Sequence, residues 1–301
     1  MNLALIGGLG YIGARLQVSL EENGHTVSVF DLALRGVPFG SGSFKRKDYR
    51  LMQASDLSSA DVIIVFAGHS SVSQANRDPG GAIDHNVVGM FNLLKISEGR
   101  PFIFASSGSV YDTCRGLPSS EESVLSPSRN PYDLSKTMFD QMAAMSESNW
   151  TSLRLGTVNG PSPNMRFDLV VNRMVADAMC KGVVQVSNGY VHRAILALDD
   201  LCEALPNILS SHRNSFGLLN IGSFNTTVDE IATTVAMITG AELKIQPSSS
   251  TYDFTMATRK ASDTFGFNPK YDIKMLVQKL VNFFSNEGAQ QLTKYSQQSS
   301  Q

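Results

Sequence analysis

The chain opens with a short apolar run that leads directly into a glycine-rich turn. Residues 2–6 are typical of a buried strand in a parallel sheet. Gly7, Gly10 and Gly13 follow at three-residue spacing, before a helical pattern over residues 11–23. Glycines at this spacing permit a tight turn and let a pyrophosphate approach the helix N-terminus, where free N–H groups attract an anion. The sequence therefore predicts a βαβ unit that binds a dinucleotide.

An acidic residue ends the second expected strand. Residues 26–30 have a strand pattern, and Asp31 follows at the position, about 20 residues after the glycines, where a carboxylate binds the ribose hydroxyls of NAD. A carboxylate there would repel the 2′-phosphate of NADP, although Arg35 lies close in sequence and could offset the repulsion. The sequence thus favours NAD over NADP. The alternative is that Asp31 is only a solvated residue at the end of a strand.

Strand-like and helix-like segments alternate along the first half of the chain. The expected strands are 61–66, 101–105 and 151–155, and the expected helices are 83–98 and 132–148. This rhythm predicts an α/β fold, a doubly wound parallel (Rossmann) sheet with helices on both faces. Ligands of such sheets bind at the carboxyl ends of the strands.

The pattern is less regular after residue 156. We interpret residues 1–156 as the NAD-binding Rossmann domain, to which some later strands and helices return. Residues 157–285 are expected to form mainly a smaller, discontinuous substrate-binding lobe, and 286–301, rich in Gln and Ser, a flexible polar tail. The elements expected in the later chain are helices over 165–180, from 199 onward, 228–239 and 273–284, and a strand over 218–221 of the smaller lobe.

A tyrosine and a lysine lie four residues apart at the start of the last helix of the first domain. On a helix, Tyr132 and Lys136 leave the same face. A phenol has an ordinary pKa of about 10, and a nearby ammonium stabilises the phenolate and lowers that pKa. The pair could exchange a proton with an alcohol or a carbonyl.

Composition argues against several classes of partner. The formal net charge is −2, which does not indicate a nucleic-acid or membrane partner. No apolar run approaches the roughly 20 residues that cross a bilayer. The three widely spaced cysteines, Cys114, Cys180 and Cys202, indicate a reducing compartment and no zinc site. We therefore expect a cytoplasmic protein without a metal.

The order and spacing of these motifs resemble those of the extended short-chain dehydrogenase/reductases, in particular the NAD-dependent nucleotide-sugar epimerase/dehydratase family. The resemblance spans residues 2–284. It is carried by Gly7–Gly13, Asp56-Leu57, Ala67–His69, Asn86–Gly89, Ser106–Tyr111, Tyr132–Lys136, Arg154–Pro161 and by Arg193 ahead of Asp199-Asp200.

The resemblance implies a role for each matching position. Ser107, Tyr132 and Lys136 correspond to the catalytic Ser/Thr, the tyrosine acid/base, and the lysine that holds the nicotinamide ribose and lowers the tyrosine pKa. The residues implied to bind NAD are Gly7, Gly10, Tyr11, Ile12, Gly13, Asp31, Asp56, Leu57, Ala67, Gly68, His69, Asn86, Ser106, Tyr132 and Lys136. Those implied to bind substrate are Ser107, Thr157, Asn172, Arg193 and Arg259.

Two departures from the family pattern concern the substrate phosphates. The family commonly has Asn where Thr157 stands and Tyr where Asn159 stands, so the phosphate contact there is in doubt. Arg193 corresponds to the arginine that pairs with the diphosphate, a task that suits a bidentate guanidinium. Arg166 lies in a segment that usually lines the same cleft, with a solvated surface position as an equal alternative.

The residues after Ser107 narrow the implied reaction. The 4,6-dehydratases that resemble this chain carry an acidic pair there, because eliminating water needs a further proton donor and acceptor. Here the two positions hold Gly108 and Ser109. The resemblance therefore implies an NAD-dependent nucleotide-sugar 4-epimerase that works through a 4-keto intermediate.

Two alternatives remain open. An NAD(P)-dependent ketoreductase or dehydrogenase of a nucleotide sugar or related small molecule would use the same three catalytic residues but would exchange its cofactor. A non-catalytic cofactor-binding protein would not need them. The resemblance also implies a homodimer, in which helices 83–98 and 132–148 pair with those of a second copy.

Overall fold

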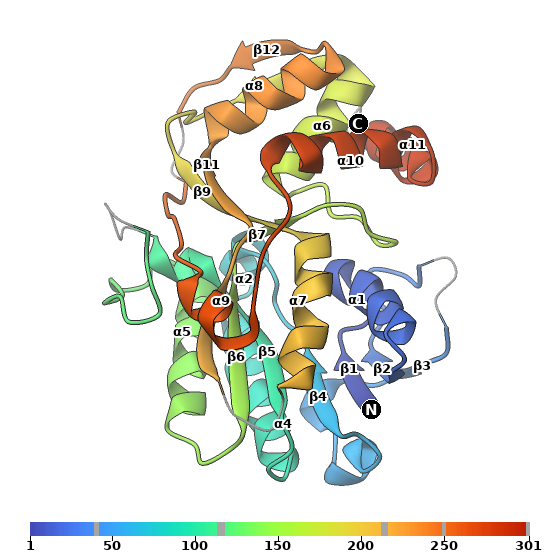
Figure 1. Cartoon of the computed structure of the whole chain (residues 1–301), viewed down its shortest axis with the longest axis vertical. Helices are drawn as coiled ribbons and strands as arrows, with labels where there is room; N and C mark the ends of the chain where they lie inside the picture. Colours follow the sequence, from blue (N-terminus) through green and yellow to red (C-terminus); the bar gives the residue numbers. More distant parts are fainter. Residues whose placement is uncertain (39–41, 113–117, 212–215, 249–250, 299–301) are drawn as a thin grey trace.

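The protein has two lobes, a larger one that contains the N-terminus and a smaller one that contains the C-terminal helix (Figure 1). The computed structural model describes residues 1–38, 42–112, 118–211, 216–248 and 251–298. Cys114 lies outside these described residues.

The larger lobe is built on a seven-stranded sheet in the order β10-β6-β5-β4-β1-β2-β3, and every pair of neighbours is parallel. The predicted doubly wound Rossmann sheet is therefore confirmed. The strand order reverses between β1 and β4, and this switch point is where such sheets bind ligands. The strands are β1 (Asn2–Ile6), β2 (Thr26–Asp31), β3 (Phe44–Arg46), β4 (Val62–Val65), β5 (Phe102–Ser107), β6 (Trp150–Leu155) and β10 (Gly217–Ile221).

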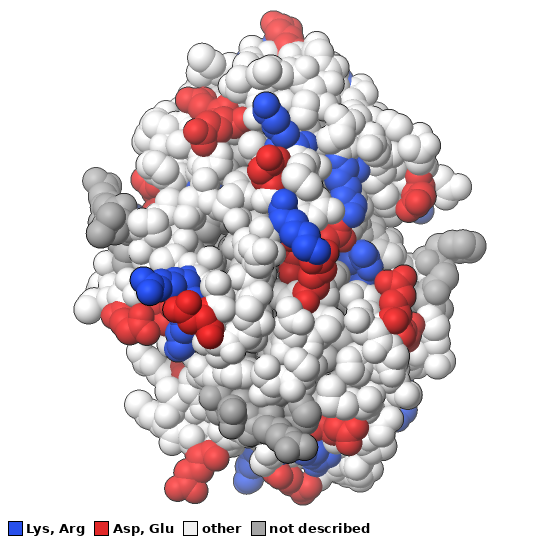
Figure 2. Space-filling view, viewed as in Figure 1, with Lys and Arg blue, Asp and Glu red and all other residues white. Residues whose placement is uncertain are grey.

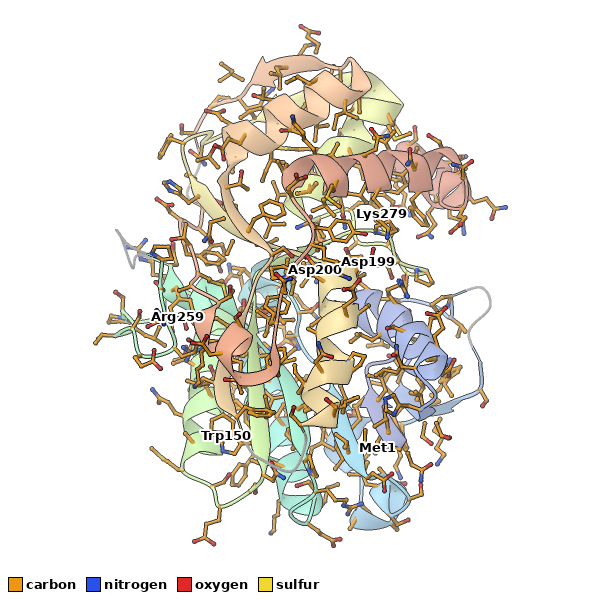
Figure 3. The ribbon with its side chains drawn as sticks, viewed as in Figure 1. Met1, Trp150, Asp199, Asp200, Arg259 and Lys279 are labelled. Atoms are coloured by element: carbon orange, nitrogen blue, oxygen red, sulfur yellow. The ribbon has the colours of Figure 1, made fainter. Side chains whose placement is uncertain are left out.

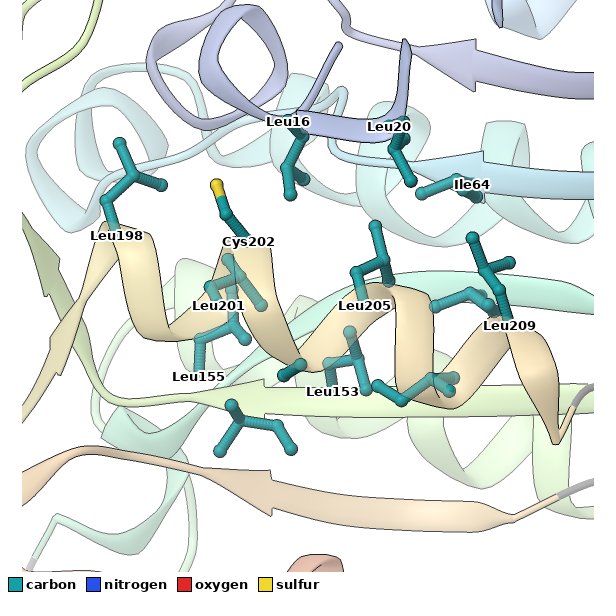
Figure 4. Close-up of a cluster of buried hydrophobic side chains, with 14 of the residues drawn as sticks. Leu16, Leu20, Ile64, Leu153, Leu155, Leu198, Leu201, Cys202, Leu205 and Leu209 are labelled. Carbon is teal, nitrogen blue, oxygen red and sulfur yellow. The ribbon is translucent and has the colours of Figure 1, made fainter. Parts of the chain in front are cut away.

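Helices cover both faces of this sheet (Figure 1). On one face, leucines of α7 (Leu198–Ser210) fill the space between Leu16 and Leu20 of α1 (Tyr11–Glu22) and the strand residues Leu153 and Leu155 (Figure 4). The opposite face packs against α4 (Met90–Ile96) and α5 (Pro131–Ala144). Shorter elements complete the lobe: η1 (Tyr49–Leu51), η2 (Ala54–Leu57), α2 (Val72–Arg77), α3 (Pro79–Ile83), η3 (Asp84–Gly89), η4 (Gly108–Tyr111) and α9 (Arg259–Phe265).

The smaller lobe combines two small sheets with a helical core. Its sheets have the orders β11-β9-β7 and β12-β8. The core lies between α6, α8 and α10. The elements are β7 (Thr157–Asn159), α6 (Val170–Lys181), β8 (Val183–Val186), β9 (His192–Ala197), β11 (Phe224–Thr227), α8 (Val228–Thr239), β12 (Glu242–Ile245), α10 (Ile273–Ser285) and α11 (Ala289–Gln298).

Three elements differ from their predicted positions. Residues 218–221 belong to the large sheet, because β10 pairs with β6 along its whole length. The helix expected from residue 83 begins earlier, because Asp78 caps α3 ahead of it. The chain then continues from α3 into the π-helical turn η3. The helix expected from 165 begins only at Val170, where the buried Asn159 accepts hydrogen bonds from the first free N–H groups.

The predicted flexible tail is wrong for residues 289–298, which form the helix α11. Leu292 and Tyr295 lie on one face of this helix and pack against the core of the smaller lobe. The Tyr295 ring stacks on Phe167 with centroids 4.5 Å apart, and its hydroxyl donates a hydrogen bond to Asp177. Apolar and polar contacts with the smaller lobe, including hydrogen bonds of Gln291 with the Met165 N–H and the Ser162 carbonyl, thus hold in place a segment whose composition is polar.

Charges of both signs are intermixed on the face of the molecule in Figure 2. This agrees with the formal net charge of −2. Within the described ranges, no helix combines the length and apolar character needed to span a membrane.

Candidate functional site

A cavity of about 560 Å³ lies between the lobes, at the carboxyl ends of the large sheet. The larger lobe contributes Ser107, Tyr132 and Lys136 to its wall, and Arg193 and Tyr252 line it from the other side. The three residues predicted to be catalytic therefore share one cavity, although they come from two different elements, β5 and α5.

A second cavity, of about 250 Å³, lies beside the glycine turn. Gly7, Gly10, Gly13 and Asp31 line it, so the predicted dinucleotide residues lie together. Both cavities share lining residues at the switch point, namely Tyr11, Ile12, Phe66, Ala67, Gly68, His69, Ser70 and Arg166. One elongated ligand could therefore reach from the glycine turn to Tyr132.

The turn fits a pyrophosphate because side chains are excluded from it. Gly7 has φ +85°, and a Cβ on Gly13 would lie 2.1 Å from the Gly7 carbonyl oxygen. The Asp31 carboxylate accepts hydrogen bonds from the N–H groups of Leu9 at 3.0 Å and Ala33 at 2.7 Å. This fixes the carboxylate at the cavity wall and leaves lone pairs for ribose hydroxyls.

Tyr132 and Lys136 are positioned by the start of α5. Asn130 caps this helix and Pro131 occupies its first position, which places Tyr132 in the first turn. The Lys136 ammonium lies 5.8 Å from the centre of the Tyr132 ring and donates a hydrogen bond of 2.8 Å to the Ala105 carbonyl. The lysine is thus tied to the end of β5, near Ser107, which was predicted to be catalytic.

Burial dominates the protonation of both groups. It raises the pKa of the Tyr132 phenol above its ordinary value, while a hydrogen bond with Ser107 and the charge of Arg166 act in the opposite direction. Burial also lowers the pKa of Lys136 to about 8. The lowered tyrosine pKa expected from the Tyr–Lys spacing is therefore not found, because desolvation outweighs the groups that favour the phenolate.

Asn86 supports the site from behind the cavity wall, whereas Ser106 is part of that wall. The Asn86 amide binds both the N–H and the carbonyl of His69 and also donates to Ser135, so it holds the chain after β4 in place. A Cβ on Gly68 would lie 2.4 Å from the Asn86 side-chain oxygen. Ser106 lines the larger cavity but donates its own hydrogen bond to Asp140.

Asp56 and Leu57 are not among the described residues that line the two cavities. Asp56 forms an ion pair with Lys47 at 2.6 Å and accepts a hydrogen bond from the Gln53 N–H. Leu57 is fully buried in the core of the larger lobe. Lys47 itself lines the smaller cavity, so Asp56 is linked to this cavity only through its ion pair with Lys47.

The predicted substrate residues divide into two groups. Ser107, Thr157 and Arg193 line the larger cavity. Asn172 is fully buried behind it, where its amide binds the Gly160 N–H, the Tyr11 hydroxyl and the Arg166 carbonyl. It therefore positions the residues of the wall instead of facing the ligand.

Arg259 is not at the cavity. Its side chain is 90% exposed and pairs with Asp263 one turn along α9. Figure 3 shows it on the larger lobe, at the surface. The predicted phosphate contact is therefore not supported, because α9 packs beside β10 of the large sheet and this side chain is exposed to solvent.

Arg166 lies in the cavity walls with most of its side chain shielded from water, so the solvated alternative is wrong. It lines both cavities and its side chain is 12% exposed. Asp168 pairs with its guanidinium at 2.6 Å, and the Ser70 carbonyl accepts a further hydrogen bond. The spacing Arg-Phe-Asp is too common to reveal this, because the partners that bury it come from another lobe.

Two adjacent carboxylates hold the lobes together above the site, a role that the sequence did not indicate. Asp199 binds Arg15 of α1 and Lys279 of α10. Asp200 is buried and accepts hydrogen bonds from Ser223 and from the N–H groups of 270 and 271. Figure 3 shows the two carboxylates at the start of α7, between the lobes.

Acidic, histidine and cysteine side chains do not gather into a metal site within the part of the chain that the structure describes. Cys180 and Cys202 are both free thiols.

Residues 3–222 match the model of the NAD dependent epimerase/dehydratase family. The chain belongs to this family. The cofactor of this epimerase/dehydratase is therefore NAD, as the sequence predicted, and the glycine turn and Asp31 form a site that fits it.

Relatives of known name include epimerases. The chain is 27% identical to the UDP-glucose 4-epimerase of Mycoplasma genitalium, across 95% of this chain and 96% of that protein. It is 25% identical to the UDP-glucose 4-epimerase of Halalkalibacterium halodurans, across 90% and 91%.

Solved structures with the same fold include both reaction types of the family. The UDP-glucose 4-epimerase of Thermotoga maritima, solved with UDP-glucose, has a TM-score of 0.85 at 24% identity, covering 95% of this chain and 99% of that one. An NAD-dependent NDP-hexosamine 5,6-dehydratase of tunicamycin biosynthesis has a TM-score of 0.84 at 24% identity, covering 94% and 97%. The fold alone therefore does not separate epimerisation from dehydration.

Replacing Asp31 by alanine should narrow the preference of this family member for NAD over NADP by about tenfold or more, because a charged hydrogen-bond acceptor of the ribose is lost. The measurement is the dissociation constant of each dinucleotide for protein freed of its cofactor. Asp61→Ala is a matched control, since Asp61 also accepts a backbone hydrogen bond, from Asn2. An unchanged ratio of the two constants in Asp31→Ala would reject the ribose role.

Proposed function

We propose that the protein is an NAD-dependent nucleotide-sugar 4-epimerase that works through a 4-keto intermediate. The observation that carries the proposal is the wall of the larger cavity, where Ser107, Tyr132 and Lys136 meet. The two residues that follow Ser107, Gly108 and Ser109, are not acidic. Gly108 packs so closely that a Cβ would lie 2.2 Å from the Met256 sulfur. A carboxylic acid side chain at position 108 would therefore displace the buried side chains of Met256 and Phe254.

The proposed chemistry needs one proton transfer at the sugar. Tyr132 removes the proton of the C4 hydroxyl, and Ser107 hydrogen-bonds the same oxygen as it becomes a ketone. Lys136 lies one helical turn away, and its ammonium places positive charge 5.8 Å from the centre of the Tyr132 ring. Bound NAD supplies the hydride acceptor and, for the return step on the opposite face, the hydride donor.

Arg193 is the residue we assign to the substrate diphosphate. Its guanidinium lines the cavity and is held by Thr251 and by the carbonyl of Tyr252. Arg193→Ala should raise KM for a nucleotide sugar by about tenfold to a hundredfold, since a charged hydrogen bond is lost. Arg259→Ala, an exposed arginine outside the cavity, serves as the control and should leave KM unchanged. A similar rise for an unactivated sugar would place Arg193 away from the phosphates.

The test of the proposed function is a panel of UDP-, dTDP-, GDP- and CDP-sugars, incubated with the protein without added cofactor. The configuration at C4 is followed by NMR. Interconversion of C4 epimers without net NADH supports the proposal and identifies the nucleotide. Turnover only after NAD(P) or NAD(P)H is supplied would instead indicate a dehydrogenase or ketoreductase, and loss of water would indicate a dehydratase.

We further propose the homodimer that the family resemblance implies. Val88 and Phe91, at the junction of η3 and α4, and Leu134 of the neighbouring α5 are exposed apolar residues. The molar mass in solution, measured by light scattering after size exclusion, tests this assembly. A mass of one chain at micromolar concentration would contradict it.

A further inference from the structure

A carboxyl group is buried directly behind the catalytic serine. Asp133 is 4% exposed and follows Tyr132 in α5, so its side chain leaves the helix in a different direction. Its Oδ1 accepts a hydrogen bond from the Ser109 hydroxyl, and its Oδ2 accepts one from the Asn130 amide at 2.6 Å. The Tyr252 phenol also hydrogen-bonds this carboxyl group. Buried carboxyl groups are rare unless they are paired, so this one needs an explanation.

Hydroxyl groups connect this carboxyl group to the catalytic tyrosine. The Ser109 oxygen lies 2.8 Å from the Ser107 oxygen. Ser107 in turn hydrogen-bonds the Tyr132 phenol. A continuous path of hydrogen bonds therefore runs from Asp133 through Ser109 and Ser107 to Tyr132. Both serines line the larger cavity, whereas Asp133 is not among its described lining residues.

Charge repulsion couples the two ends of this path. Burial raises the pKa of Asp133, and the ionised carboxylate contributes to the raised pKa of Tyr132. Two negative charges at such short range in a desolvated site exclude each other, as in coupled carboxylate pairs. A single negative charge shared along the path avoids this penalty.

Other titratable or charged groups face the same region from several elements. Asp112, which follows η4, raises the pKa of Asp133, and Arg129 pairs with Asp112 at 3.8 Å. Tyr252 faces Asp133 from the chain after β12, with its own pKa raised by burial. Arg166 favours the Tyr132 phenolate from the opposite wall.

We propose that Asp133 is a positioning residue that holds the proton of Tyr132, received through the hydroxyl groups of Ser107 and Ser109. The inference rests on the proposed epimerase function. As the Tyr132 O–H bond breaks, its proton bonds to the Ser107 oxygen, the Ser107 proton passes to Ser109, and the Ser109 proton bonds to Asp133 Oδ1. Tyr132 becomes a phenolate and Asp133 becomes neutral, so the total charge is unchanged and no other reactant is needed.

These proton transfers from Tyr132 through Ser107 and Ser109 to Asp133, here called the relay, explain how a buried phenol can act as a base near neutral pH. The sugar hydroxyl gives its proton to the Tyr132 phenolate while Asp133 stores the proton that Tyr132 gave up. Reversal of the same steps restores the starting state after the sugar has been reduced again. Asp133 thereby acts through Ser109 and Ser107 without contacting the substrate.

The kinetic test compares Asp133→Asn with the wild type across a range of pH. Asparagine keeps the shape but cannot take up the proton, so kcat should fall by about tenfold to a hundredfold near neutral pH. The deficit should shrink as pH rises, because hydroxide can then remove the phenol proton directly. Ser109→Ala interrupts the path and leaves the carboxyl group in place, so it should show the same pH-dependent deficit.

Thr137→Ala is the matched control within the same helix. The Thr137 hydroxyl donates a hydrogen bond of 2.9 Å to the Asp133 backbone carbonyl and lies off the path. Its activity and pH profile should equal those of the wild type. A deficit in Asp133→Asn that is the same at every pH would indicate a purely structural role, and normal activity in both Asp133→Asn and Ser109→Ala would overturn the relay.

A second measurement does not depend on turnover. Protein with bound NAD is labelled with ¹³C at the tyrosine Cζ, and the Tyr132 signal is assigned by its loss in Tyr132→Phe. Lys136, whose pKa burial lowers to about 8, lies 5.8 Å from the centre of this ring and also titrates, so the step assigned to Asp133 is the one at lowest pH. We expect the signal in the wild type to shift first as Asp133 titrates and last at the pKa of the phenol. Ser109→Ala should remove most of the first step, because the hydrogen-bonded path is broken.

The two readouts separate this inference from the proposed function. Absence of the low-pH step from the wild type, or its persistence in Ser109→Ala, would overturn the relay even if the wild type epimerises a sugar. A low-pH step that Ser109→Ala removes, in a protein that converts none of the nucleotide sugars, would overturn the epimerase assignment and support the relay by itself.

Discussion

Replacing Tyr132 by phenylalanine is expected to lower turnover by about a thousandfold or more, because the variant lacks the phenol that we propose as the general acid/base. The aromatic ring and its packing remain, so NAD should stay bound. The rate is measured with the nucleotide sugar that the panel identifies, and the cofactor is quantified after the protein is denatured. Loss of activity with a full complement of NAD would assign the proton transfer to this phenol.

Tyr190→Phe is the matched control for Tyr132→Phe. The Tyr190 side chain is 71% exposed, so removal of its hydroxyl should change neither the rate nor the cofactor content. A Tyr132→Phe variant within about tenfold of the wild-type rate would instead show that another group moves the proton.

Removing the carboxylate of Asp140 should lower the free energy of unfolding by about 3–5 kcal/mol. Asp140 forms an ion pair with Arg154 at 2.9 Å, and the two side chains are only 2% and 4% exposed. The same carboxylate accepts hydrogen bonds from Ser106 and Ser152. Asp140→Ala would leave the Arg154 guanidinium charged and poorly paired inside the protein. Urea unfolding, followed by circular dichroism, measures the loss.

An exposed ion pair provides the control for Asp140→Ala. Asp263 pairs with Arg259 at 3.4 Å, and both side chains are mostly exposed. Asp263→Ala should therefore change the free energy of unfolding by less than about 1 kcal/mol. Equal losses in the two variants would mean that burial does not determine the strength of the Asp140 pair.

The Asp140 pair also links stability to the site. Asp140 belongs to α5, which carries Tyr132 and Lys136, whereas Ser106 belongs to β5, which ends at Ser107. Their hydrogen bond of 3.1 Å holds this helix against this strand. Weakening it should therefore misplace the residues that we propose to be catalytic before the whole fold is lost.

Local patterns were sufficient for the sheet and the cofactor. The expected strand over 26–30 is β2 (Thr26–Asp31), and the helix over 228–239 has the predicted bounds. Apolar periodicity depends on neighbouring residues alone, and the glycine spacing marks a turn whose close backbone approach excludes side chains. For the same reason the NAD-binding turn, Asp31 and the sequence Tyr132–Lys136 could be recognised before the structure was known.

Side-chain environments could not be predicted in this way. Asn172 and Arg166 were both assigned to the substrate cleft region, yet one is fully buried behind the wall and the other is part of it. Arg259 faces solvent, and the polar C-terminal segment forms a packed helix. In each case the decisive neighbours are far away in sequence.

The sequence by itself determined the fold class, the family and the cofactor, because these depend on short patterns with few structural solutions. Only the tertiary structure decided that burial raises the Tyr132 pKa and that Asp133 reaches this tyrosine through two serines. The physical reason is that desolvation and hydrogen bonding depend on the atoms around a group, and folding brings those atoms together from separate segments of the chain.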